Sequence, residues 1–195
     1  IRRARHAVEV THAIHSARWK WVPSTYYDWP LAQRAKILGA PTTHHLCKSL
    51  LMENKKQRSP KPGDDLSTNP RFMLIVIQYD ATLDITKLMT AIRRLRPVAE
   101  RLEESRFEFR LATPEDNDRI TGYPNGAVTP FGLKDVTVPI LLSASVVPLQ
   151  YFWMGGGHIN LKVGMAVQDF VTKCPNVRVM DLSVARDPND DVDEE

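Results

Sequence analysis

The chain has 195 residues, of which 43% are hydrophobic and 25% charged, with a formal net charge of +3. These values suit one soluble globular domain with a sizeable core, and no apolar run approaches the ~20 residues of a membrane span. The two cysteines, Cys47 and Cys174, are too few for a disulfide framework. We therefore expect a reducing compartment, the cytoplasm, and no association with a membrane.

The net charge conceals an asymmetry between the body of the chain and its end. Residues 187–195 contain six acidic side chains and no basic one, and without them 26 basic side chains stand against 17 acidic ones, a net charge of +9. A basic body suits an anionic partner such as RNA, although solvated surface lysines and arginines explain it equally well. We expect residues 184–195 to form an acidic, disordered tail.

Apolar residues recur at loosely helical spacing from Arg3 to about Lys20, which predicts a helix within an N-terminal extension, residues 1–23. Residues 19–29 are aromatic and expected to be extended. A short helix should follow and end at Gly39, which serves as its C-cap. Residues 46–54 are expected to form a strand, and the proline-rich residues 55–70 an exposed loop.

Residues 72–77 are all apolar, which predicts a central strand buried on both faces. Asp84 is placed to cap a helix that Pro97 stops or kinks, and we expect residues 98–107 to continue as helix. Thr113 should cap another short helix. The remaining expected elements are strands at 107–112, 138–147, 149–153, 159–163 and 177–183, and a helix at 166–174. Because strands and helices mix without strict alternation, we expect a single α+β domain with a mixed sheet flanked by helices.

Residues 121–132, TGYPNGAVTPFG, contain three glycines and two prolines. Glycine permits a positive φ or close approach to a ligand, and proline fixes φ, so the backbone shapes this loop. Its free N–H groups and the hydroxyls of Thr121, Tyr123 and Thr129 could face a polar ligand. Two consecutive turns in an ordinary connection explain the same composition.

Lys48 lies in the apolar strand LCKSLL, where alternation places it on the face of Leu46 and Leu50, opposite Cys47. An ammonium group is costly to bury there unless an anion balances it, although a lysine on an edge strand can extend to solvent. His44 and His45 next to Cys47 raise the question of a metal. Adjacent histidines bind one poorly, and we expect no metal site.

In chain order, residues 38–52, the loop 121–132, and residues 154–163 with their apolar neighbours resemble the YbaK-type aminoacyl-tRNA deacylases. These proteins are also called prolyl-tRNA-synthetase-associated editing domains. The resemblance covers roughly residues 24–183 and implies a deacylase domain between the N-terminal extension and the tail.

The resemblance implies that Lys48 contacts the 3′ end of the substrate and is essential for deacylation. It also implies that the loop shapes the aminoacyl pocket, with backbone N–H groups directed at the ester carbonyl. Gly155, Gly156 and Gly157 fall where the family has a glycine turn, although a plain turn before the next strand explains them too. The implied substrate-binding residues are Tyr26, which aligns loosely with a tyrosine on the family's first strand, Gly122, Tyr123, Gly126, Thr129, Pro130, Gly155, Gly156 and Asn160.

The chain departs from the family at four positions. Family members often have glycine where Ala127 stands, a serine near Met154, and acids near Ser143 and Asn160. These departures leave open which amino acid is removed and whether activity is retained.

The expected function is that of a trans-editing hydrolase that deacylates mischarged aminoacyl-tRNA, with tRNA for proline as the substrate. The expected partners are aminoacylated tRNA and an aminoacyl-tRNA synthetase, and no cofactor is required. The alternative is a non-catalytic module that binds tRNA or a synthetase within a larger translation assembly.

Overall fold

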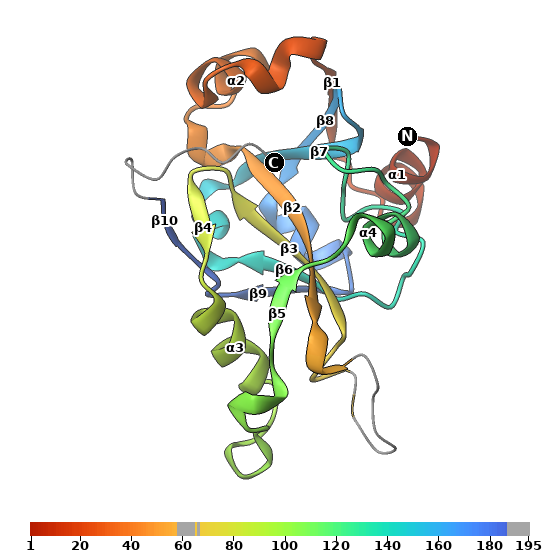
Figure 1. Ribbon diagram of the computed structural model, residues 1–195. Helices are drawn as coiled ribbons and strands as arrows, with labels where there is room; N and C mark the ends of the chain where they lie inside the picture. Colours follow the sequence, from red (N-terminus) through yellow and green to blue (C-terminus); the bar gives the residue numbers. More distant parts are fainter. Residues whose placement is uncertain (58–64, 66, 187–195) are drawn as a thin grey trace.

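The computed structural model describes residues 1–57, 65 and 67–186 (Figure 1). Its main sheet is mixed, with strand order β5-β2-β3-β6-β9. Strand β2 pairs antiparallel with β3 and β5, whereas β3 with β6 and β6 with β9 are parallel. The bounds are β2 Cys47–Asn54, β3 Phe72–Gln78, β5 Phe109–Leu111, β6 Ile140–Ser143 and β9 Val177–Met180. The expected α+β domain with a mixed sheet is confirmed.

A second sheet is antiparallel, with the order β1-β8-β7, and consists of β1 Arg18–Trp21, β8 Leu161–Ala166 and β7 Tyr151–His158. An isolated parallel bridge between Leu46 and Trp153 joins the entry of β2 to β7. Strands β4 Ala81–Leu83 and β10 Ser183–Ala185 form a separate antiparallel pair. The bridge brings the predicted lysine strand next to the glycine-rich strand β7.

Strand β3 is buried along its whole length, as predicted. Its alternate side chains enter two different cores: Leu74 and Val76 pack between the sheets with Phe152 of β7, and Ile75 and Ile77 pack under helix α3. The strand is covered on both faces because each side of the main sheet is covered by other elements.

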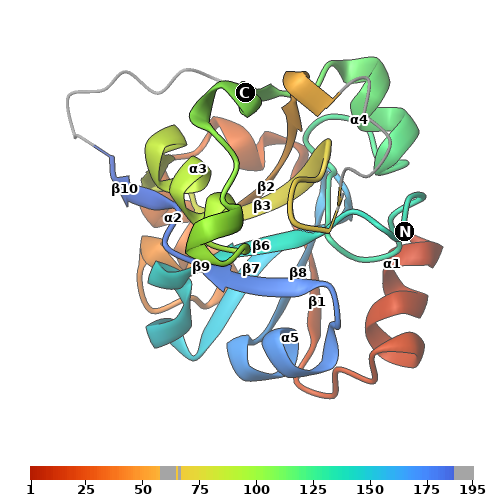
Figure 2. The ribbon, with the colours of Figure 1, turned by 90° about the horizontal axis from the view of Figure 1, so that it is seen from below.

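Five α-helices lie among the described residues: α1 Arg2–His6, α2 Leu31–Leu38, α3 Ile85–Arg93, α4 Pro114–Ile120 and α5 Val167–Lys173. Helices α3 and α5 cover opposite faces of the main sheet (Figure 2). Three predicted helix ends are confirmed. Asp84 accepts the Lys87 N–H at 3.0 Å, Thr113 accepts the Asp116 N–H at 3.2 Å, and Gly39 ends α2 with φ of 71°.

The helix predicted from Arg3 to Lys20 is wrong beyond its first half. Helix α1 passes into a π-helical turn, Ala7–Thr11, and Arg18–Trp21 form strand β1. Pairing with β8 determines the structure of this segment, and a local periodicity gives no sign of a partner strand 140 to 146 residues away. Ala4, Ala7 and Val8 belong to the core between the sheets. The boundary at residue 23 remains a prediction.

Four further secondary-structure predictions are corrected. Residues 98–107 form two 3₁₀ turns, Val98–Glu100 and Glu104–Arg106, because Pro97 and Glu103 before them are extended. Ser24–Asp28, expected to be extended, form a 3₁₀ turn after Pro23. The strand expected at 138–147 ends at Ser143, where a 3₁₀ turn begins. The glycine cluster 155–157 lies within β7 rather than in a turn.

Parts of two other predictions fall outside the described residues. These are the acidic residues 187–195 and most of the loop between Gln57 and Ser67. The first residues of the predicted disordered tail, 184 and 185, instead belong to β10 and pair with β4. Within the part of the chain that the structure describes, no helix is long and apolar enough to cross a bilayer.

Candidate functional site

The loop 121–132 follows α4 and depends on its glycines. Gly122, Gly126 and Gly132 have φ of 72°, 74° and 66°, in the left-handed region that other residues rarely adopt. The hydroxyl of Tyr123 donates to the carbonyl oxygen of Phe131 at 2.7 Å, and that of Thr121 to the Asn117 carbonyl at 2.8 Å. These two hydroxyls therefore shape the loop from within.

Helix α1 supports the base of the loop. The Arg3 guanidinium donates to the Gly122 carbonyl oxygen at 2.7 Å and lies 4.9 Å from the centre of the Tyr123 ring. At Gly132, a Cβ would come within 2.7 Å of the Arg3 backbone. The two ends of the loop are thus held against the same residue.

The tip of the loop, residues 126–129, contains backbone N–H groups that make no hydrogen bond with the described residues. The Gly126 N–H donates to Asn125 Oδ1 at 2.9 Å, and the Ala127 N–H to the Pro124 carbonyl at 3.0 Å. Within the described residues, the N–H groups of Val128 and Thr129 make no hydrogen bond. The Thr129 hydroxyl is buried and likewise has no partner there. Among the described residues, the N–H groups of Asn125, Phe131 and Gly132 also make no hydrogen bond, and Val128 is the one of these five residues whose backbone contacts β7, at Gly155.

Strand β7 lies against this tip. A Cβ at Gly155 would be 2.7 Å from the Val128 carbonyl oxygen, so the absence of a side chain lets the loop rest on the strand. At the far end of the cluster, Gly157 has φ of 85°, and the pairing with β8 shifts register between Gly155 and His158. The expected importance of Gly155 thus has a steric basis, although its contact with a substrate remains a prediction.

The alternation of side chains along β2 places Lys48 near the loop tip and β7. Cys47 and Leu51 enter the core between the sheets, so Lys48 lies on the opposite face, with Leu46. Leu46 bridges Trp153 in parallel, and Lys48 follows Leu46 by two residues as Gly155 follows Trp153. The structure therefore brings the Lys48 strand and the loop-bearing part of β7 together.

Tyr26 is buried with 2% of its surface exposed, and it lies in the 3₁₀ turn rather than on a strand. Burial raises its pKa well above the ordinary value. Its neighbour Tyr27 is the residue that reaches the loop, because its hydroxyl donates to the Gly126 carbonyl oxygen at 3.2 Å. This role was not predicted from the sequence, in which the adjacent tyrosine pair was the only signal of it.

The same region contains two cations that the sequence did not predict there, Arg34 and Lys162. Arg34 lies 5.4 to 5.8 Å from the ring centres of Tyr26, Tyr27 and Tyr79. Lys162 is only 4% exposed and contacts Tyr27. No local motif marks either residue, because four separate elements bring these side chains together.

The four departures from the family pattern have different structural meanings. Met154 is in the core between the sheets, on the face of β7 opposite Gly155, and Ala127 is also buried. Ser143 is 1% exposed, with its hydroxyl 2.8 Å from that of Ser183. Asn160 lies in the turn after β7, next to Ile159, whose side chain would be 3.5 Å from a Cβ at Gly126. Of the four, Asn160 and Ala127 are adjacent to the loop tip.

The histidines near Lys48 have other partners. His44 Nδ1 lies 2.7 Å from Asp80 Oδ2, and His45 Nδ1 lies 3.0 Å from Thr42 Oγ1. Among residues 1–57, 65 and 67–186, no three histidine, cysteine or acidic side chains converge as metal ligands would. Cys47 is fully buried, and desolvation raises the pKa of its thiol, so the reactive thiolate is disfavoured.

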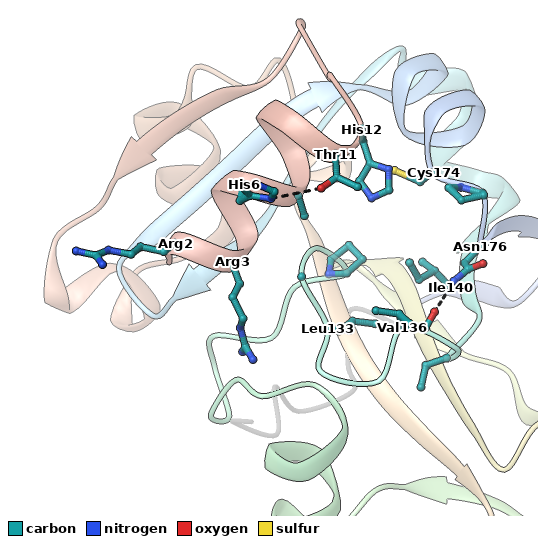
Figure 3. A pocket seen from close by; sticks show the side chains of 15 residues that line it. Arg2, Arg3, His6, Thr11, His12, Leu133, Val136, Ile140, Cys174 and Asn176 are labelled. Carbon is teal, nitrogen blue, oxygen red and sulfur yellow. Dashed lines mark hydrogen bonds between the residues drawn. The ribbon is translucent and has the colours of Figure 1, made fainter.

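A cavity of about 650 Å³ lies on the other side of the loop, between α1 and residues 130–138 (Figure 3). Leu133, Val138 and Cys174 contribute to its apolar wall, with His6 and His12 on the side of α1. Lys48 and Gly126 do not line it. It is therefore separate from the site formed by the loop tip and β7, and the predicted substrate-binding residue Pro130 lines this cavity.

Comparisons with known proteins identify the family and the fold of this chain. The family model described as an aminoacyl-tRNA editing domain matches residues 31–173. A solved structure of a candidate trans-editing enzyme for prolyl-tRNA synthetase is 21% identical, covers 94% of this chain and 96% of its own, and has a TM-score of 0.70. A scaffold protein for epitope backbone grafting is 17% identical over the same shares, with a TM-score of 0.68. Among curated proteins, none matches the chain significantly.

Proposed function

The chain belongs to the aminoacyl-tRNA editing domain family, and from that premise we propose that it is a trans-editing hydrolase. Its proposed reaction is hydrolysis of the ester that joins a wrong amino acid to tRNA, with tRNA for proline as the substrate. The structurally similar trans-editing protein is described in connection with prolyl-tRNA synthetase, which supports this choice of tRNA. A synthetase partner and a cytoplasmic location belong to the same proposal.

One observation carries the proposal: the tip of the loop rests on Gly155 with two unused N–H groups, beside the strand that holds Lys48. Ester hydrolysis develops negative charge on the carbonyl oxygen, and preorganised N–H groups stabilise that charge strongly where water is excluded. The N–H groups of Val128 and Thr129 are the donors we assign to this oxyanion. Gly126 gives the turn that presents them.

Lys48 is assigned to the 3′ end of the tRNA. Its ammonium can neutralise a phosphate or hydrogen-bond the terminal ribose, and it lies on the strand face next to β7. Fixing the ester against the loop contributes by orientation, since effective concentrations of reacting groups rise steeply when they are held in place. Lys48 thus acts as a substrate-binding residue that is required for the chemistry.

The reaction proceeds by attack of water on the ester carbonyl. The carbonyl carbon forms a bond to the water oxygen and then releases the ribose oxygen, which takes one proton of the attacking water and leaves as the tRNA hydroxyl. The amino acid departs with the new carboxylate, and the second proton of the water passes to solvent. In this proposal the attacking water is oriented by the substrate's own hydroxyl or thiol, or by the terminal ribose, so that no side-chain nucleophile is needed.

The remaining assignments complete the aminoacyl pocket. Gly122, Tyr123 and Pro130 keep the shape of the loop, Thr129 offers a buried hydroxyl, and Gly156 adjoins Trp19 and Leu161 in the second sheet. Tyr26 and Asn160 flank this region. We propose that these groups limit the size of the amino acid that enters.

The decisive experiment measures ester loss from tRNA for proline charged with alanine, cysteine or serine. Wild-type protein should hydrolyse at least one of them faster than spontaneous loss, and K48A should not. Correctly charged prolyl-tRNA is the matched control. Tight binding of tRNA without hydrolysis of any of these substrates would instead identify a non-catalytic module.

A further inference from the structure

Lys162 is a buried cation on β8 that the proposed reaction does not use. It is 4% exposed and pairs in register with Gly155 of β7 and with the exposed Lys20 of β1. Burying an ammonium group is expensive unless it is well solvated by protein groups. Burial lowers the pKa of Lys162, while the Tyr27 hydroxyl acts in the opposite direction. The burial of the Lys162 ammonium, at this cost in desolvation, therefore indicates a structural or functional role.

The contacts of Lys162 are a hydroxyl, a carbonyl and two aromatic rings. Its ammonium donates to the Tyr27 hydroxyl oxygen at 2.5 Å and to the Ile159 carbonyl oxygen at 3.2 Å. It lies 4.3 Å from the centre of the Tyr27 ring and 4.9 Å from that of Tyr26. Within the described residues, no carboxylate forms an ion pair with it. Oriented dipoles and ring faces, rather than an anion, stabilise the charge.

Both hydrogen-bond acceptors lead to the loop tip. The Tyr27 hydroxyl, which accepts from Lys162, donates to the Gly126 carbonyl oxygen at 3.2 Å. Ile159, whose carbonyl accepts from Lys162, lies beside the α-carbon of Gly126, where an added Cβ would be 3.5 Å from its side chain. One ammonium group therefore links the turn after β7 with the 3₁₀ turn that carries Tyr27, on two sides of Gly126.

Arg34 does not provide this link. Its guanidinium donates to the backbone carbonyls of Trp29, at 2.7 Å, and Tyr27. Those bonds hold the 3₁₀ turn against α2, and neither ends on the loop. Arg34 fixes the backbone of Tyr27, whereas Lys162 fixes its hydroxyl.

We propose that Lys162 is a positioning residue for the loop 121–132. It acts through two hydrogen bonds in series, from its ammonium to the Tyr27 hydroxyl and from that hydroxyl to the Gly126 carbonyl. This inference rests on the proposed function, because it assigns the loop tip to the oxyanion. Held in this way, the amides of Val128 and Thr129 keep the direction they need before substrate arrives. Lys162 itself does not touch the reacting atoms.

The test is a double-mutant cycle of Y27F, K162M and the double variant, with K20M as the matched control. Y27F removes a single hydroxyl from a partly buried ring, so it preserves the fold even if K162M does not. Each single variant should lower kcat for the mischarged tRNA by about tenfold or more with little change in KM, since misplacement by about 1 Å can cost a hundredfold. The double variant should be no worse than the poorer single variant, because both substitutions break the same series of two hydrogen bonds. K20M should match wild type.

Hydrogen exchange of residues 121–132 provides a readout that does not need activity. Y27F should speed amide exchange in this loop several-fold and leave α5 unchanged. Unaltered kcat and exchange in Y27F, or additive losses in the double variant, would overturn the inference. If the wild-type protein hydrolyses no mischarged tRNA, the proposed function fails, and the exchange comparison, extended to K162M, still decides whether Lys162 holds the loop through Tyr27.

Discussion

The α-carbon of Gly155 lies so close to the carbonyl oxygen of Val128 that an added Cβ would be only 2.7 Å from it. Real Cβ atoms essentially never approach another atom this closely. The atom that the Cβ would meet belongs to the backbone of Val128, so it cannot move aside as the end of a flexible side chain could. The contact therefore sets the distance between β7 and the tip of the loop 121–132.

G155A should disturb that distance. The loop must move away from β7, which we expect to cost about 1–3 kcal/mol of stability, as overpacking generally does. Deacylation should fall by about tenfold or more, because the loop amides no longer point at the ester carbonyl. Thermal unfolding and kinetics of the purified variant check both effects. An unchanged melting temperature with wild-type kinetics would show that the loop adapts freely to the strand.

G126A tests the conformation of the tip rather than its packing. The space beside Gly126 admits a methyl group at ordinary contact distance, 3.5 Å from Ile159, but φ is 74°. A left-handed alanine should cost about 1 kcal/mol. Activity should fall much more than this strain alone explains, because the turn presents the two unused N–H groups.

G39A is the matched control for that experiment. Gly39 has φ of 71°, with nothing within 4 Å of the added Cβ, and it caps α2. The two alanine variants should therefore lose similar stability, measured by chemical denaturation, while only G126A loses deacylation. Equal kinetics for both would mean that the loop is a simple connection.

Local signals predicted a good part of this fold. The unbroken run of apolar residues in β3 is enough by itself to predict that both faces of the strand are buried. The helix caps Asp84, Thr113 and Gly39 are also predictable, because each one interacts only with its own helix turn. The strand β1 was missed because its identity depends on pairing with β8, far along the chain. Once the sheet forms, the hydrogen bonds to β8 outweigh the local preference of this segment for a helix.

The site divides in the same way. Lys48 and the loop glycines stand out in the sequence, because a charge in an apolar strand and closely spaced glycines are unusual locally. Tyr27, Arg34 and Lys162 do not, since the 3₁₀ turn, α2 and β8 must pack before these side chains meet. Only the assembled structure shows that a lysine in INLKV contacts Tyr27, whose hydroxyl reaches the loop.

K48A should abolish deacylation and leave the fold intact. Lys48 is only partly buried, so its truncation should change stability by less than about 1 kcal/mol. K48R retains the charge but not the point-like ammonium, and it should recover at most part of the activity. Single-turnover assays with mischarged tRNA measure the loss, and circular dichroism verifies the fold. Wild-type rates in K48A would remove Lys48 from the site.

Binding of tRNA should weaken steeply as salt rises. Apart from residues 187–195, the chain has 26 basic against 17 acidic side chains, and neutralising phosphates releases counterions, so log Kd should rise in proportion to log salt. Truncation after Arg186 removes six negative charges, which would repel RNA, so it should tighten binding or leave it unchanged. Uncharged tRNA titrated from about 50 to about 200 mM salt with both lengths of chain measures the two effects. A flat salt response would argue against RNA as the partner. Weaker binding by the truncated chain, at an unchanged melting temperature, would mean that the acidic residues themselves make productive contacts.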